Sequence, residues 1–158
     1  TTQSNAGQVV KDMRAVGFKA KFMVPDGCFE TAFIEAAGAK NLEGSTFITF
    51  AGLPPQQLTG KGKEFYENYK KKYGVEPEGY AAYGYESAKV ALTAIAAAGK
   101  RDRKAITAAA AAIQNFDGIL GNWSFNDQGD TNLTKMSGNI VENGQFKFAK
   151  ILSLGGAE

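Results

Sequence analysis

The sequence predicts an α/β fold, with helices covering a sheet of largely parallel strands. Over residues 1–50, stretches with helical periodicity alternate with short apolar runs of strand length, which is typical of a parallel sheet with covering helices. The stretch 79–99 repeats apolar residues at helical spacing and ends at a glycine, so we expect a long core helix there. At 158 residues, the chain is long enough to bury a core of its own.

In residues 1–50 the predicted order is helix, strand, helix, strand. Ser4 is expected to cap the first helix and Gly17 to end it. The buried stripe of this helix is expected at Val9, Val10, Met13 and Val16. A short buried strand is predicted at 22–24, and the Pro25-Asp26-Gly27 that follows it indicates a turn.

The second helix of this region is predicted from about Glu30 to Ala37, and the second strand over 45–50. Its inward-facing residues are expected to be Ala32, Phe33, Ala36 and Ala37. The sequence Gly52-Leu53-Pro54-Pro55 then breaks the pattern, which indicates a linker or a crossover to another part of the fold.

Three helices are predicted beyond this break: a charged helix at 62–73, the long helix at 79–99, and a helix at 103–113 capped by Asp102. The apolar side of the long helix is expected to hold Tyr80, Tyr83, Gly84, Ser87, Val90, Ala91, Ala94, Ile95 and Ala98. Its polar side is expected to hold Glu86, Lys89, Thr93 and Lys100. An apolar side with many small residues suits close packing on a sheet.

The last part of the chain changes to short strands and turns. Residues 116–118 are expected to form a turn, 122–125 a strand, and 127–130 a second turn. Two further strands, at 136–141 and 145–152, flank Glu142-Asn143-Gly144, and Asn-Gly is a strong hairpin signal.

Composition excludes several kinds of chemistry. The chain has no histidine, which excludes Ser-His-Asp and Cys-His catalysis within it. Its one cysteine, Cys28, excludes an intrachain disulfide and a cysteine-rich zinc site. Asp127 and Asp130 lack the further ligands of a calcium loop, and no phosphate-binding glycine motif is present. We therefore expect neither an enzyme nor a metal or cofactor site.

Charge and hydropathy bear on partners and location. The 18 basic and 16 acidic residues nearly balance, so nothing favours nucleic acid or an anionic membrane as a partner. No apolar run reaches the length of about 18 residues that a membrane span needs. The first residues do not resemble a signal peptide, so we expect either a cytoplasmic chain or a mature or truncated product.

Asp26 is the strongest candidate for contact with a small molecule. It follows a predicted buried strand, and ligands of α/β sheets bind outside the carboxyl ends of the strands. A carboxylate there could hold an ammonium or a hydroxyl group. The alternative is a turn aspartate that bonds its own backbone. The tyrosines at 80, 83 and 85 indicate core packing, with one ring facing a ligand cleft as the alternative.

Three segments together carry a family resemblance: PDGCFETAFIEAAG (25–38) with LEGSTFITF after it, FYENYKKKYGVEPEGYAAYGYESAKVALTAIAAAG (65–99), and FDGILGNWSFNDQGD (116–130). In order and spacing, over nearly the whole chain, they resemble the type I periplasmic solute-binding proteins of the branched-chain amino-acid (Leu/Ile/Val) group. Such proteins have two lobes, each a three-layer α/β sandwich, and the chain crosses between the lobes three times. This chain resembles only the carboxyl-terminal part.

The resemblance implies a division of the chain. Residues 1–50 would belong to the second lobe and residues 51–134 to the first, while residues 135–158 would return to the second lobe and the hinge. The absent amino-terminal part would supply most of the first lobe's sheet and the groups that grip the ligand's carboxylate. Without it, the apolar faces of the helices between 60 and 113 are expected to be exposed, Tyr80, Val90, Ala94 and Ile95 among them.

The resemblance also implies a ligand site. In the family an acidic residue after a second-lobe strand holds the ligand's ammonium, and Asp26 has that position. Tyr80, at the start of the long helix, would line the side-chain pocket. Cys28 joins the candidates beside Asp26, and Thr2 stands where many relatives have a tyrosine two residues before the first helix.

The function implied is a solute receptor of an ABC importer, which binds a branched-chain or related amino acid and docks on a membrane permease. Its location would be the periplasm. In a Gram-positive source, it would be anchored to the outer side of the membrane. A ligand-sensing domain of a regulator or receptor with the same fold is the alternative. The remaining partner is expected to be the rest of the protein or a second copy of the chain.

Overall fold

The computed structural model describes residues 3–152, and the side chains of residues 5–152, as two compact units. Unit 1 comprises the chain up to Pro54 together with the chain from Lys135 onward, and unit 2 comprises Pro55–Thr134. The chain therefore leaves unit 1 after Pro54 and re-enters it after Thr134. Among the described residues, no helix combines the length and the apolar character needed to cross a bilayer.

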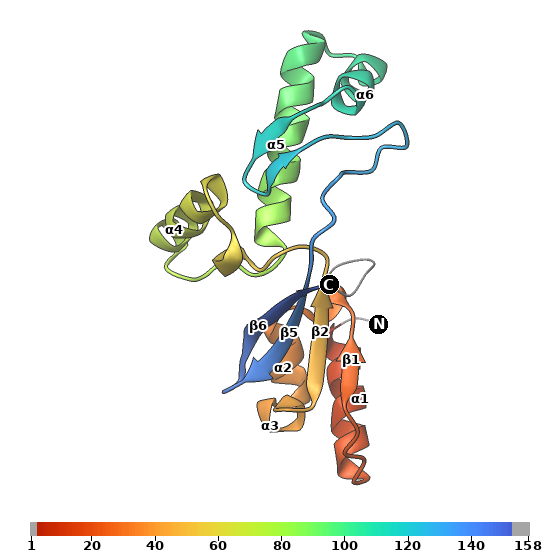
Figure 1. The fold of residues 1–158 in the computed structure, drawn as a ribbon, viewed down its shortest axis with the longest axis vertical. Coiled ribbons are helices and arrows are strands. Elements are labelled where there is room, and N and C mark those ends of the chain that lie inside the picture. The colour runs from red at the N-terminus through yellow and green to blue at the C-terminus, as the bar shows by residue number, and fades with distance from the viewer. Residues whose placement is uncertain (1–2, 153–158) are drawn as a thin grey trace. The chain divides into compact units, whose positions relative to one another are not determined.

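Unit 1 is built on a four-stranded mixed sheet with the strand order β1-β2-β5-β6 (Figure 1). The first two strands are parallel, as the alternation of helices and strands predicted, whereas β5 is antiparallel to both of its neighbours. The strands are β1 (Phe22–Val24), β2 (Thr46–Phe50), β5 (Met136–Glu142) and β6 (Gln145–Leu152). Strands from the two ends of the chain thus share one sheet.

The core of unit 1 lies between this sheet and its helices. The helices are α1 (Gln3–Ala15), α2 (Thr31–Ala37), α3 (Ala39–Leu42) and the 3₁₀ helix η1 (Asp26–Cys28). Figure 1 shows α1, α2 and α3 on one face of the sheet. Alternate residues of β2 are buried, and so are five residues of the helices: Val10, Phe33, Ile34, Ala37 and Leu42.

The expected burial of the first two helices is only partly right. Val10 is buried, but Val9 is 45% exposed and Val16 is 83% exposed, because the helix ends at Ala15 and Val16 lies beyond its last turn. The helix begins at Gln3, so Ser4 lies inside the first turn and does not precede it. In the second helix Ala32 is exposed and Ile34 is buried. The four-residue helix α3 was not predicted.

The hairpin predicted near the end of the chain is confirmed. Glu142 pairs with Gln145, and the two residues between them, Asn143 and Gly144, have φ angles of 53° and 71°. Positive φ at both central positions is the geometry of a type I′ turn, which matches the twist of the flanking strands and favours Asn-Gly.

Unit 2 contains the three predicted helices and a small two-stranded sheet (Figure 1). Its elements are η2 (Pro55–Gln57), α4 (Lys61–Tyr73), α5 (Ala81–Ala98), α6 (Arg103–Ala111), β3 (Phe116–Gly118) and β4 (Gly121–Trp123). Gly99 ends α5 in the left-handed conformation, with φ 62°. The predicted cap of α6 is confirmed, because the Asp102 side chain accepts a hydrogen bond of 2.8 Å from the Ala105 amide.

Two expectations for unit 2 are wrong. Residues 116–118, expected to be a turn, form strand β3. The turn lies directly after this strand, at Ile119 and Leu120. The polar side assigned to the long helix contains a buried residue, Glu86, which is 3% exposed, while several residues of the expected apolar side are exposed. Those exposed residues include Gly84, Ser87 and Ala91. Ile95 and Tyr80 are exposed, as expected for a chain without the amino-terminal part, whereas Ala94, which was also expected to be exposed, is buried. The physical reason is that the β3–β4 hairpin lies over the Glu86 side of α5 and supplies hydrogen-bond donors to its carboxylate.

Candidate functional site

Asp26 lies just beyond the carboxyl end of β1, the strand that pairs in parallel with β2 in unit 1. It is the first residue of η1, two residues after the last residue of the strand, and it is partly exposed. Its backbone carbonyl accepts a hydrogen bond of 2.8 Å from the Phe29 amide. Its carboxylate makes no hydrogen bond or ion pair with any described residue, so the alternative of an aspartate that bonds its own backbone is not what the structure has. The carboxylate is therefore available to a ligand.

Cys28 shares the single turn of η1 with Asp26, but its side chain is buried. Burial raises the pKa of the Cys28 thiol, and the Asp26 carboxylate nearby raises it further. The thiol is thus packed away from solvent within unit 1. Thr2, the remaining candidate from this region, lies outside the described residues.

Tyr80 belongs to unit 2, where it is the residue before α5. The residue is 40% exposed, so it is partly accessible, as a pocket-lining residue requires. One helical turn later, burial raises the pKa of Tyr83 to about 12, and Tyr80 adds to the shift. The structure thus brings Asp26 and Cys28 together, while the place of Tyr80 in the same site stays a prediction.

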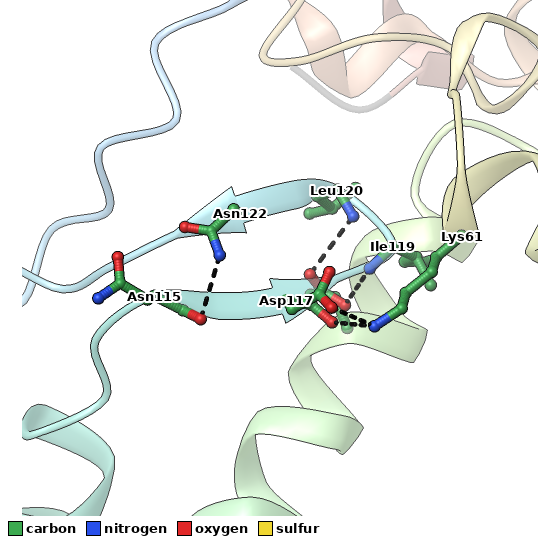
Figure 2. A network of polar contacts seen from close by, with 7 residues as sticks. Lys61, Asn115, Asp117, Ile119, Leu120 and Asn122 are labelled. Atoms are coloured by element: carbon green, nitrogen blue, oxygen red, sulfur yellow. Dashed lines mark hydrogen bonds and ion pairs between the residues drawn. The ribbon is translucent and has the colours of Figure 1, made fainter.

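A polar network in unit 2 was missed by sequence reasoning (Figure 2). The carboxylate of Glu86 accepts hydrogen bonds from the amides of Ile119 (3.0 Å) and Leu120 (3.4 Å) and from Nε1 of Trp123 (2.9 Å). Beside it, Nζ of Lys61 donates to Oδ2 of Asp117 at 2.6 Å. In the sequence Glu86 falls on the polar side of the helix with Lys89 and Thr93, and helical periodicity assigns such a residue to the solvent.

Unit 2 also has a groove of about 550 Å³ between α4, α5 and β3. Its aromatic lining consists of Phe65, Tyr69, Tyr73, Tyr85 and Phe116. The rings of Phe65 and Tyr85 connect α4 with α5, with centroids 5.1 Å apart. None of the three candidate residues that the structure describes, Asp26, Cys28 and Tyr80, lines this groove. Among the described residues, no group of three or more His, Cys, Asp and Glu side chains could hold a metal ion.

Comparison with known proteins gives consistent matches. Residues 1–142 match the family described as periplasmic binding protein. The Leu/Ile/Val-binding protein homolog 1 of Brucella suis is 30% identical over 128 residues, which are 81% of this chain and 33% of the relative.

Solved structures extend the match to the fold. The leucine binding protein LivK of Thermotoga maritima has a TM-score of 0.86 at 30% identity and aligns with 96% of this chain. LivJ of Streptococcus pneumoniae, solved with isoleucine, has a TM-score of 0.82 at 23% identity, aligns with 98% of this chain, and is a likeness of fold alone. The chain spans 43% of each of these two proteins.

Proposed function

The chain belongs to the periplasmic binding protein family, and from this premise we propose that it is part of an extracytoplasmic receptor for a branched-chain or related amino acid. Its fold is that of the type I binding proteins, of which it covers only part. The observation that carries the proposal is the unpartnered, partly exposed carboxylate of Asp26 at the carboxyl end of a strand.

Asp26 suits the ammonium group of an amino acid. An ionised carboxylate only accepts hydrogen bonds, and bonds between charged partners are shorter and stronger than neutral ones. The position outside a strand end is where sheets of this class bind ligands. Because no described residue competes for the carboxylate, the ligand would not have to displace an internal partner.

The other candidates are proposed in supporting roles. Tyr80 would line the pocket for the ligand's side chain, with its exposed ring as the apolar wall. Cys28 would act from below, as a buried neutral group that packs under Asp26. Thr2 is retained as a ligand-contacting position.

We also propose how the chain divides between the lobes. Residues 1–50 and 135–158 would belong to the second lobe and its hinge, and residues 51–134 to the first. The two compact units, which change over at Pro54 and Thr134, support this assignment.

The wider role proposed is that of a solute receptor for an ABC importer, located outside the cytoplasmic membrane. Closure of two lobes on the amino acid would create the form that docks on the permease, because only contacts that differ between states shift a conformational equilibrium. Binding and release need no chemical step, so the role requires no catalytic residue. A sensing domain of a regulator or receptor is the second candidate, and it would use the same Asp26.

Calorimetry with leucine tests the role of Asp26. The protein for this test carries the present residues together with the portion that solved relatives have and this chain lacks. We expect Asp26→Asn to weaken leucine binding by about 1.5–3 kcal/mol, or roughly ten- to a hundredfold in Kd, because the ammonium would then face a neutral amide in place of a carboxylate.

Two controls sharpen this experiment. Glu35→Gln removes an exposed carboxylate from the same unit and should leave Kd unchanged. 4-Methylpentanoate, which is leucine without its ammonium group, should not lose affinity in Asp26→Asn. Unchanged leucine affinity in Asp26→Asn would remove Asp26 from the site.

A further inference from the structure

The turn between β3 and β4 is held from both sides by the two helices that flank it. The amide of Ile119 donates to Oε2 of Glu86, on α5, at 3.0 Å. The carbonyl oxygen of the same residue lies so close to Gly62, on α4, that a Cβ at position 62 would stand 2.5 Å from it. Ile119 itself is buried. One turn residue therefore contacts both helices through its backbone.

On the α5 side, the contact depends on Glu86. Its carboxylate is buried, and it accepts hydrogen bonds from the amides of Ile119 and Leu120 (Figure 2). It also accepts one from Nε1 of Trp123, so these three donors all belong to the hairpin. No cation pairs with it among the described residues. The glycine at position 118 leaves space for the Glu86 carboxylate, because a Cβ there would stand 1.7 Å from Oε1 of Glu86.

On the α4 side, the contact combines an ion pair with close packing. Nζ of Lys61 donates both to Oδ2 of Asp117, at 2.6 Å, and to the Asp117 carbonyl, at 3.0 Å. The ion pair is solvent-exposed and therefore contributes little by itself. The close approach of Gly62 to Ile119 is buried and allows no side chain at position 62. On this side, the position of the turn relative to α4 is set mainly by close packing.

From this arrangement we infer that the β3–β4 turn is a strap that fixes α4 relative to α5, and that Glu86 is the positioning residue that holds the strap. Without the carboxylate, three donors that point into the protein lose their acceptor, which favours opening of the hairpin. When the hairpin opens, α4 loses the surface against which Gly62 packs. The hairpin and α4 then become mobile together, and the groove between α4 and α5 loses its β3 wall.

Amide hydrogen exchange of the 158-residue chain tests this inference, and it needs no ligand. In Glu86→Ala, we expect the amides of Ile119 and Leu120 to exchange roughly ten- to a hundredfold faster, the factor that corresponds to a lost bond to a charged group. The amides of α4 should accelerate in the same variant. Glu86→Gln keeps one acceptor oxygen and should give an intermediate acceleration in both segments.

Three further measurements separate this result from general destabilisation. Amides of unit 1 should keep their protection, since the unit has its own core. Asp102→Ala, which removes the cap of α6, should accelerate α6 and leave α4 unchanged. Trp123 fluorescence checks that the indole has lost its partner in Glu86→Ala.

The outcomes are distinguishable. Parallel acceleration of the hairpin and α4, graded from Glu86→Gln to Glu86→Ala, supports the strap. Faster exchange at Ile119 and Leu120 with unchanged α4 overturns it, because α4 would then be held by other contacts. If unit 2 of Glu86→Ala does not fold, the comparison of the wild type with Glu86→Gln decides. Exchange of the α4 amides that is equally slow in these two proteins would overturn the inference.

Discussion

Single side chains in this chain differ sharply in how their charge is handled. Glu86 is buried with hydrogen-bond donors around it, whereas Asp26 is partly exposed and has no such partner. Removing a buried acceptor leaves its donors unsatisfied, which is costly, while an exposed carboxylate can be neutralised at little cost in stability. Asp26→Asn should therefore affect binding, and Glu86→Ala should affect the fold of unit 2.

Tyr83 gives a residue-scale prediction for alkaline pH. Its pKa rises from 10.0 to about 12 because burial disfavours the phenolate. The folded state thus holds the proton more tightly than the unfolded state. The stabilisation is fully present below pH 10 and is lost as pH rises through about 12.

Tyr83→Phe has no proton to lose, so its stability should depend less on pH in this window. Between pH 10 and about 12, we expect the wild type to lose on the order of 2 kcal/mol more than Tyr83→Phe. Urea unfolding at each pH measures the difference, and Tyr73→Phe controls for removal of an exposed phenol. Equal slopes for wild type and Tyr83→Phe would contradict the expectation.

Helices and turns of this chain depend on a few local signals at their ends. Gly74 and Gly99 follow α4 and α5 in the left-handed conformation, and the Asp102 side chain caps α6. A capping side chain accepts a bond from an amide that has no partner within the helix. Such signals act over three or four residues and do not need the rest of the fold.

At the element scale we predict the cost of losing one cap. Asp102→Ala should lower the free energy of unfolding of unit 2 by about 1 kcal/mol, within the range of 0.5–2 kcal/mol typical of such caps. Exchange protection should fall first at Ala105, whose amide loses its acceptor. Asp127→Ala, in an exposed turn, is the matched control and should change stability little. An effect of equal size in both variants would contradict a capping role.

The whole molecule exposes apolar surface. Longer relatives have additional residues that would cover such a surface. Helix α5 is apolar around most of its circumference, a composition typical of a buried helix, yet Leu92 is 63% and Ile95 48% exposed. The chain spans only 43% of the solved LivK and LivJ proteins. Large exposed apolar patches drive association.

We therefore predict that the 158-residue chain, by itself, self-associates and binds leucine weakly or not at all. Lobe closure needs ligand contacts from both lobes, and on the proposed division this chain would carry only the ammonium side of the site and part of one wall. Light scattering measures the association, and calorimetry with leucine measures the binding. Leu92→Lys should reduce association, while Lys71→Ala, in an already exposed polar position, should not. A monomer with micromolar affinity for leucine would show this prediction to be wrong.

The sequence by itself determined the elements whose causes are local. Positive φ at Asn143 and Gly144, the cap at Asp102 and the glycine after α5 all follow from the residue at that position and its near neighbours. The location of Asp26 after a short apolar strand was predictable for the same reason.

Only the tertiary structure decided which faces are buried and which polar groups are satisfied. Glu86 is buried because Trp123, 37 residues away, reaches its carboxylate, and Asn139 of β5 bonds the Ile48 carbonyl of β2 across 91 residues. The burial of Cys28 and the free carboxylate of Asp26 likewise depend on what packs around η1. Periodicity marks a face as apolar or polar, but burial is set by the segments that come to lie on it, and these come from distant parts of the chain.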